Sequence, residues 1–218
     1  RVLDRGKTIF ELENLGLLPD DMAKIEKLIK KLFLFGFPVL LAATATNIIT
    51  YTDTLTITFF RSLQEVGLYQ VAMPTANLLL YFSIALTTSL FPLVSELWTK
   101  KRYKYVANGL NLILRGSFII IILPTLILIT FPELVIEILF GEKFIAAIPV
   151  LQVLTIAFVF ATFSTILITA LYGIGKPSTN AKIAITIAIF NLITNIILVP
   201  ILGITGAAIT TLCSYAIY

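Results

Sequence analysis

Long stretches without charge constrain this chain more than any other feature of its sequence. Between Leu32 and Phe60 the only charged side chain is that of Asp53. A helix needs about 20 mostly apolar residues to cross the roughly 30 Å hydrocarbon core of a bilayer. Five segments meet this requirement, and a sixth begins near the end of the sequence, which predicts an all-α, polytopic membrane helix bundle with six spans. The predicted spans are 32–60, 66–97, 106–131, 146–172, 178–200 and 203–218.

The composition agrees with a membrane protein and excludes several kinds of chemistry. Hydrophobic residues make up 58% of the chain and charged residues 13%, whereas a soluble domain is about 25% charged. The chain has one cysteine, Cys213, and no histidine, so cysteine–histidine catalysis and an intrachain disulfide are excluded within it. Polar groups are too sparse for an acid–base pair, and no phosphate-binding G-x-x-x-x-G-K-[ST] motif is present. We therefore expect neither an enzyme nor an ATP-driven pump.

The positions of the cations predict the orientation in the membrane. Thirteen of the 16 lysines and arginines lie before the first span or in the second-to-third and fourth-to-fifth connections. Cytoplasmic loops carry such an excess of positive charge. The N-terminal segment of this multi-pass protein is thus predicted to be cytoplasmic, with the spans in the cell membrane. The basic run "TKKRYK" is interpreted as part of this signal, and no nucleic-acid partner is expected.

The region before the first span is predicted to have two parts. Residues 1–19 carry mixed charge and are expected to be a cytoplasmic linker. In residues 20–31 the apolar side chains share one helical face opposite lysines, which predicts an amphipathic helix that lies on the membrane surface and runs into the first span. The bundle is expected at 32–218. Its last span has only 16 residues, which reach ~24 Å, so we expect a piece of a longer protein with a truncated last helix.

The stretch "ITYTDTLTITFF" at 49–60 has threonine at every second position, a pattern typical of a half-buried strand. A lone strand in lipid would leave its backbone polar groups unpaired, so we expect a helix. An acid inside a span costs about 2.5–3.5 kcal/mol or more, and it faces a bundle interior or a wet cavity by default. Asp53 is therefore a candidate functional residue, with a structural role or a place near the outer interface as the alternative. On a helix it belongs to a polar stripe formed by Thr46, Asn47, Thr50, Asp53, Thr54 and Thr58.

Few other polar groups lie at membrane depth. Asn191 and Asn195 are four residues apart and so share one face of the fifth span. Arg115 lies in the third span, where it either snorkels to the surface or points its guanidinium, which suits a phosphate, into a central cavity. Both interpretations stay open. The candidate substrate-binding residues are Arg115, Asn47 and Thr50.

Four segments resemble a known family of transporters. They are "EVGLYQVAMP" at 65–74, "LFPLVSEL" at 90–97, "LFGEKFIAAIPVLQVL" at 139–154 and "LVPILGITGAAITTLCSY" at 198–215. In this order they resemble the polysaccharide (O-antigen type) repeat-unit flippases, whose superfamily also holds the multidrug and toxin extrusion transporters and the lipid II flippases. The resemblance implies two six-helix lobes around a central cavity and alternating access that moves a lipid-linked oligosaccharide. This chain would be the second, C-terminal lobe, and the missing N-terminal lobe would be its partner.

The resemblance also implies an ion site. In the lipid II flippases, a sodium site in the second lobe uses an acid on the first helix of that lobe, a polar pair four apart on the fifth helix and a hydroxyl on the sixth. The matching positions here are Asp53, Asn191, Asn195 and Thr211. The second residue of the pair is acidic in that family and is Asn195 here. Whether the coupling ion is sodium or a proton therefore stays open, and no other cofactor is expected.

Three functions follow from these features. The favoured one is a flippase for polyprenyl-diphosphate-linked sugars, in which Arg115 meets the pyrophosphate and Asp53 couples an ion gradient to the movement of the lobes. The second is a multidrug extruder of the same fold. The third is a membrane scaffold that transports nothing, in which Asp53→Asn would have no effect.

Overall fold

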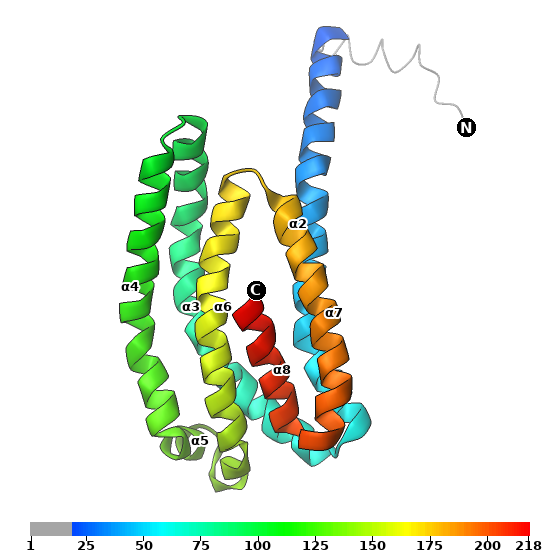
Figure 1. Ribbon diagram of the computed structural model, residues 1–218, viewed down its shortest axis with the longest axis vertical. Coiled ribbons are helices and arrows are strands. Elements are labelled where there is room, and N and C mark those ends of the chain that lie inside the picture. Colours follow the sequence, from blue (N-terminus) through cyan, green and yellow to red (C-terminus); the bar gives the residue numbers. More distant parts are fainter. Residues whose placement is uncertain (1–18) are drawn as a thin grey trace, which may run out of the picture.

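The structure is a computed structural model that describes residues 19–218, and all of its regular elements there are helices (Figure 1). The threonine-rich stretch at 49–60 is helical, as predicted. The Thr56 and Thr58 hydroxyls donate to the carbonyls of Thr52 and Thr54, at 2.7 Å each, which satisfies these hydroxyls within the helix itself. The helices are α2 (Pro19–Phe60), α3 (Leu63–Thr99), α4 (Tyr103–Thr130), α5 (Pro132–Phe140), the 3-10 helix η1 (Glu142–Ala147), α6 (Ile148–Gly173), α7 (Pro177–Leu202) and α8 (Ile204–Ile217).

Five of the described helical segments are long and apolar enough to cross a membrane. They are α2, α3, α4, α6 together with η1, and α7. Apart from the start of α2, each begins and ends within four residues of a predicted span. The sixth predicted span is present as α8, an apolar helix of 14 residues. The prediction of an all-α membrane bundle is confirmed, with five candidate spans and one shorter helix.

The predicted amphipathic segment at 20–31 is helical and runs into the first span without a break. It forms the first turns of α2, a continuous helix of 42 residues that contains Pro38 in its interior. Figure 1 shows these first turns extending past the ends of the neighbouring helices. That this part of α2 lies on the membrane surface stays a prediction. The predicted linker, apart from Pro19, lies outside the described residues.

Short turns reverse the chain between neighbouring spans. Between α2 and α3, the Ser62 hydroxyl accepts a hydrogen bond from the backbone N–H of Glu65 at 3.3 Å and so caps α3. Between α7 and α8 the connection is Gly203 alone, with a φ of 63° that residues with a side chain rarely adopt. Because both turns are short, they fix the register of α2 against α3 and of α7 against α8.

The helices pack closely through small residues. The most extensive contacts join α3 to α6 and α2 to α7, and α8 contacts both α6 and α7. Ala42 and Ala45 of α2 belong to one buried cluster with Ala181 and Ala184 of α7, and such small side chains let membrane helices approach closely. In Figure 1, α4 lies on the far side of α3 and α6 from α2. The interior is therefore shared by α2, α3, α6, α7 and α8.

Candidate functional site

Asp53 is fully buried in the bundle, with an exposed fraction of 0%. Its helix, α2, ends at Phe60, so the carboxylate lies about two turns inside the bundle from that end. A buried charge is costly unless it is paired or hydrogen-bonded. No lysine or arginine among residues 19–218 forms an ion pair with Asp53. Neutral side chains must therefore compensate this negative charge in the part of the chain described.

Three side chains donate hydrogen bonds to the Asp53 carboxylate. Tyr69 Oη donates to Oδ2 at 2.6 Å, and Thr211 Oγ1 donates to the same oxygen at 2.5 Å. Asn195 Nδ2 donates to Oδ1 at 2.7 Å. Hydrogen bonds to a charged group contribute about 1.5–3 kcal/mol each. Because the donors belong to α3, α8 and α7, the carboxylate of α2 joins four helices.

The network continues along α7 and α8. Asn195 Nδ2 also donates to Asn191 Oδ1 at 3.1 Å, and Asn191 Nδ2 donates to Ser214 Oγ at 3.1 Å. The Ser214 hydroxyl in turn donates to the backbone carbonyl of Thr210 at 2.8 Å. The side chains of this network are buried. We call the following six residues the Asp53 cluster: Asp53, Tyr69, Asn191, Asn195, Thr211 and Ser214.

One oxygen of the Asp53 cluster has no hydrogen-bond partner. It is Asn195 Oδ1, on a side chain that is 0% exposed. Buried polar side-chain atoms nearly always have a partner, so this atom calls for an explanation. The cluster offers one carboxylate, three hydroxyls and amide oxygens, and hard cations take such oxygen ligands. Because Asp53 is the one acid among these six residues, the donor set suits a cation of low charge.

The structure brings together all four residues that the sequence grouped as an ion site. Asp53, Asn191, Asn195 and Thr211 form one connected hydrogen-bond network. The sequence analysis missed Tyr69 and Ser214. A signal for Tyr69 exists, because it lies seven residues after the turn at 61–62 and Asp53 lies eight residues before that turn.

The candidate substrate-binding residues do not converge within this chain. Thr50 is half-buried, and its hydroxyl donates to the Thr46 carbonyl at 3.2 Å. Asn47 is exposed on α2 and Arg115 is exposed on α4. Since α4 lies on the far side of α3 and α6 from α2 (Figure 1), Arg115 is separated from the other two. A site that contains all three is therefore not formed by residues 19–218 alone.

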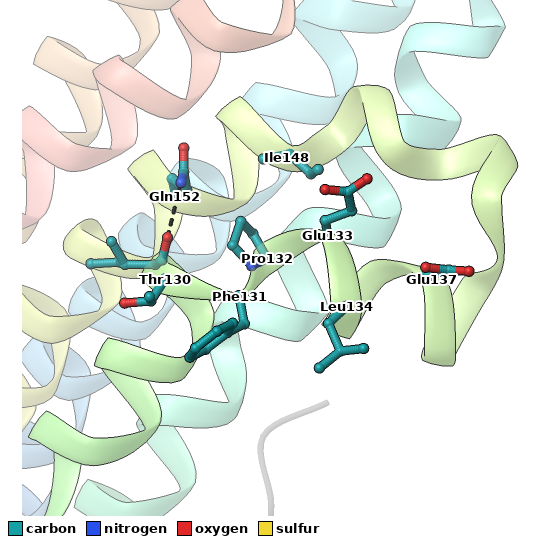
Figure 2. Close-up of a pocket in the computed structure, with 9 residues that line it drawn as sticks. Thr130, Phe131, Pro132, Glu133, Leu134, Glu137, Ile148 and Gln152 are labelled. Carbon is teal, nitrogen blue, oxygen red and sulfur yellow. Dashed lines mark hydrogen bonds between the residues drawn. The ribbon is translucent and has the colours of Figure 1, made fainter.

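A pocket of about 490 Å³ lies where α4, α5 and α6 meet, and it is distinct from the Asp53 cluster (Figure 2). Two glutamates line it, Glu133 and Glu137, and both are exposed. Gln152 Nε2 donates to the Ile129 carbonyl at 3.0 Å, so this side chain already has a partner. The pocket lacks the buried, uncompensated charge that distinguishes the Asp53 cluster.

Comparisons with known proteins agree with this architecture. Residues 8–98 match the family described as polysaccharide biosynthesis protein. An uncharacterized membrane protein of Methanocaldococcus jannaschii is 41% identical over 192 residues, which cover 88% of this chain and 38% of that protein. A probable low-salt glycan biosynthesis flippase of Haloferax volcanii is 26% identical over 168 residues, which cover 77% of this chain and 36% of that protein. The chain thus spans somewhat over a third of the length of these relatives.

The fold is similar to half of a solved transporter. That structure is an outward-facing multidrug resistance MATE family transporter of the MOP superfamily, with a TM-score of 0.72 and 16% sequence identity. The similarity covers 85% of this chain and 42% of that one, and at this identity it concerns the fold alone. The match to the polysaccharide biosynthesis protein family and the flippase relative confirm the family resemblance that the four sequence segments indicated.

Proposed function

We propose that this chain, whose residues 8–98 match the polysaccharide biosynthesis protein family, forms the C-terminal lobe of a flippase for lipid-linked oligosaccharides. In this proposal a second lobe completes a central cavity, and alternating access moves a polyprenyl-diphosphate-linked glycan across the membrane. The description of the Haloferax volcanii relative as a glycan biosynthesis flippase supports this substrate class. The match to half of a MATE transporter supports the lobe architecture.

The observation that carries the coupling part of the proposal is the buried charge of Asp53. Its carboxylate is 0% exposed and has hydrogen-bond donors but no cationic side chain among residues 19–218. A single positive charge that binds there neutralises the carboxylate, which lowers the cost of burying it. Intramembrane acids of this kind mark ion and proton pathways in transporters. A cation gradient is thus the energy source that we assign to the transport.

In the proposal the cation is cargo, held by residues of α2, α7 and α8. Asp53 supplies the negative charge, and Thr211, Asn195 and Asn191 supply neutral oxygens. These oxygens suit a sodium ion, and the carboxylate alone suits a proton. The test therefore examines both cations. Because α2, α3, α7 and α8 all contribute to the cluster, a change at the carboxylate acts on the packing of these helices. Cation binding is then coupled to lobe movement because these helices pack differently with and without the cation.

The lipid pyrophosphate is assigned to cations that face the cavity. Arg115 is the candidate within this chain, since a guanidinium forms two parallel hydrogen bonds with a phosphate. Asn47, which is exposed on α2, is the candidate for a contact with sugar hydroxyls, with Thr50 behind it. These assignments rest on the sequence analysis and on the exposure of the side chains.

The test uses the full-length protein in vesicles that contain a polyprenyl-diphosphate-linked oligosaccharide. A sodium gradient or a pH gradient is imposed, and the fraction of glycan that reaches the other leaflet is measured. We expect gradient-driven flipping in the wild type and its loss in Asp53→Asn. Glu137→Gln is the matched control, because it removes an exposed acid outside the Asp53 cluster. Gradient-driven flipping by Asp53→Asn at the wild-type rate would refute ion coupling at this residue, and uptake of cationic dyes in place of the glycan would refute the substrate class.

A further inference from the structure

We propose that Asn195 makes this ion site specific for a single positive charge, and that its side-chain amide turns over when the cation binds. The inference rests on the proposed ion coupling at Asp53, and it adds the class of cation and the residue that selects it. Its basis is the set of hydrogen bonds around Asn195.

The orientation of the neighbouring amide, Asn191, is fixed by the hydrogen-bond network. A backbone carbonyl only accepts, so the Ser214 hydroxyl must donate its hydrogen to the carbonyl of Thr210, at 2.8 Å. Ser214 Oγ can then only accept from Asn191, and it does so from Nδ2 at 3.1 Å. Asn191 Oδ1 therefore points toward Asn195, 3.1 Å from its Nδ2.

The amino group of Asn195 consequently lies between two acceptors. Its Nδ2 donates to Asp53 Oδ1 at 2.7 Å and to Asn191 Oδ1 at 3.1 Å, which uses both of its hydrogens. The other end of the same amide, Oδ1, is buried and has no partner. In this orientation Asn195 compensates the Asp53 charge with donors, at the cost of one unsatisfied oxygen. This is the arrangement expected without a bound cation.

Turning the amide over exchanges its two ends. Oδ1 then joins Asp53 Oδ1 and Asn191 Oδ1, so that three oxygens face one another. Three acceptors without a hydrogen or a cation between them repel each other, so this orientation requires a positive charge. A sodium ion satisfies all three oxygens, whereas a proton on Asp53 satisfies only the pair of Asp53 Oδ1 and the turned Asn195 Oδ1. The unpartnered oxygen is thereby explained as a ligand that is used only when the site is occupied.

The charge of the cluster limits which cation can stay. Asp53 is its only acid, and the other five members are neutral: Tyr69, Asn191, Asn195, Thr211 and Ser214. Sodium or a proton leaves the buried site neutral, whereas a divalent cation leaves an uncompensated positive charge, which is costly in the interior. An acid at position 195 would raise the negative charge to two and remove this discrimination. Asn195 is thus the specificity-determining residue of the site.

The test follows thermal unfolding of the purified full-length protein, because a ligand that binds the folded state raises Tm with its concentration. Sodium chloride and calcium chloride are titrated separately at constant ionic strength set with choline chloride, and a pH series without sodium forms the proton arm. In each titration, the rise in Tm that the wild type shows and Asp53→Asn lacks is assigned to binding at the Asp53 cluster. We expect a sodium or proton response but no calcium response in the wild type. Asn195→Asp should gain a calcium response.

A second pair of variants tests the orientation of the amides. Ser214→Ala removes the acceptor that fixes Asn191, so the half-effective concentration of the monovalent cation should rise by about tenfold or more. Thr210→Val is the matched control on the same helix, since it removes a buried hydroxyl that has no partner. It should leave that concentration unchanged.

The outcomes separate the inference from the proposed function. Suppose that the wild type responds to sodium or protons. A calcium response in the wild type, or no calcium response in Asn195→Asp, then overturns the role of Asn195 and leaves ion coupling intact. Equal effects of Ser214→Ala and Thr210→Val also overturn it, even where Asn195→Asp fails to fold. If the Tm of Asp53→Asn responds to cations as strongly as that of the wild type, the proposed ion coupling itself is overturned, and the inference with it.

Discussion

Tyr69→Phe tests how the hydrogen bonds at Asp53 control cation binding. The substitution removes the hydroxyl that donates to Asp53 Oδ2 at 2.6 Å and leaves the ring in place. Tyr69 is 0% exposed and its ring belongs to the main hydrophobic core, where a phenylalanine ring fits. Asp53 Oδ2 keeps its second donor, Thr211. The variant therefore changes one hydrogen bond and little else.

The magnitude follows from what the cation does to this hydrogen bond. A hydrogen bond to a charged group contributes about 1.5–3 kcal/mol, and one between neutral groups about 0.5–1.5 kcal/mol. When a cation neutralises Asp53, the bond from Tyr69 moves from the first class to the second and loses roughly 1 kcal/mol. The phenylalanine variant has no such bond to weaken, so its cation affinity should be about fivefold higher than that of the wild type. Without the cation, the variant should be less stable by about 1.5–3 kcal/mol.

The assay is the concentration of sodium, or of protons, that gives half of the Asp53-dependent rise in Tm of the full-length protein. This concentration should fall about fivefold in Tyr69→Phe, by the loss of roughly 1 kcal/mol derived above. Tyr51→Phe is the matched control, because Tyr51 is on the same α2 helix as Asp53 and is 64% exposed. It should leave the value unchanged. Weaker cation binding in Tyr69→Phe would refute the reasoning, since it would mean that Tyr69 Oη is itself a ligand of the cation.

Two further predictions concern packing and substrate. Gly206→Ala should destabilise the protein by about 1–3 kcal/mol, because a Cβ there would lie 2.5 Å from the Leu198 carbonyl oxygen. Its Tm should fall, whereas that of Gly109→Ala should not, since a Cβ at Gly109 has nothing within 4 Å. Arg115→Gln should slow flipping of the pyrophosphate-linked glycan in vesicles and leave the sodium response of Tm unchanged, because α4 contributes nothing to the Asp53 cluster. A normal flipping rate in that variant would remove Arg115 from the substrate site.

The bilayer makes the helices of such a chain predictable. Only segments of about 20 apolar residues span it, and their backbone must satisfy itself. These two requirements yielded all five long helices and corrected the strand-like pattern at 49–60. The short helices α5 and η1 escaped them, because helices of 9 and 6 residues are too short to show a periodicity.

The candidate site was predictable only as far as single helices allow. Spacing within a helix places Asn191 and Asn195 on one face, and burial cost singles out Asp53. Neither says which side chain of another helix will lie opposite. The grouping with Thr211 came from a family resemblance, and Ser214, which orients Asn191 through one hydrogen bond, gave no signal of its own. A serine in an apolar helix usually bonds to its own backbone, as Ser214 also does.

The two tight turns supply the missing information, because a short turn fixes the register of the helices that it joins. Asp53 lies eight residues before the turn at 61–62 and Tyr69 lies seven residues after it, whereas Asn195 and Thr211 each lie eight residues from Gly203. Both pairs are about eight residues from their turns, hence ~12 Å along the helices. The carboxylate and its three donors therefore meet at one level, two from each hairpin. In the proposed mechanism, a cation bound at this level would contact both hairpins at once, and its binding energy would act on their relative packing.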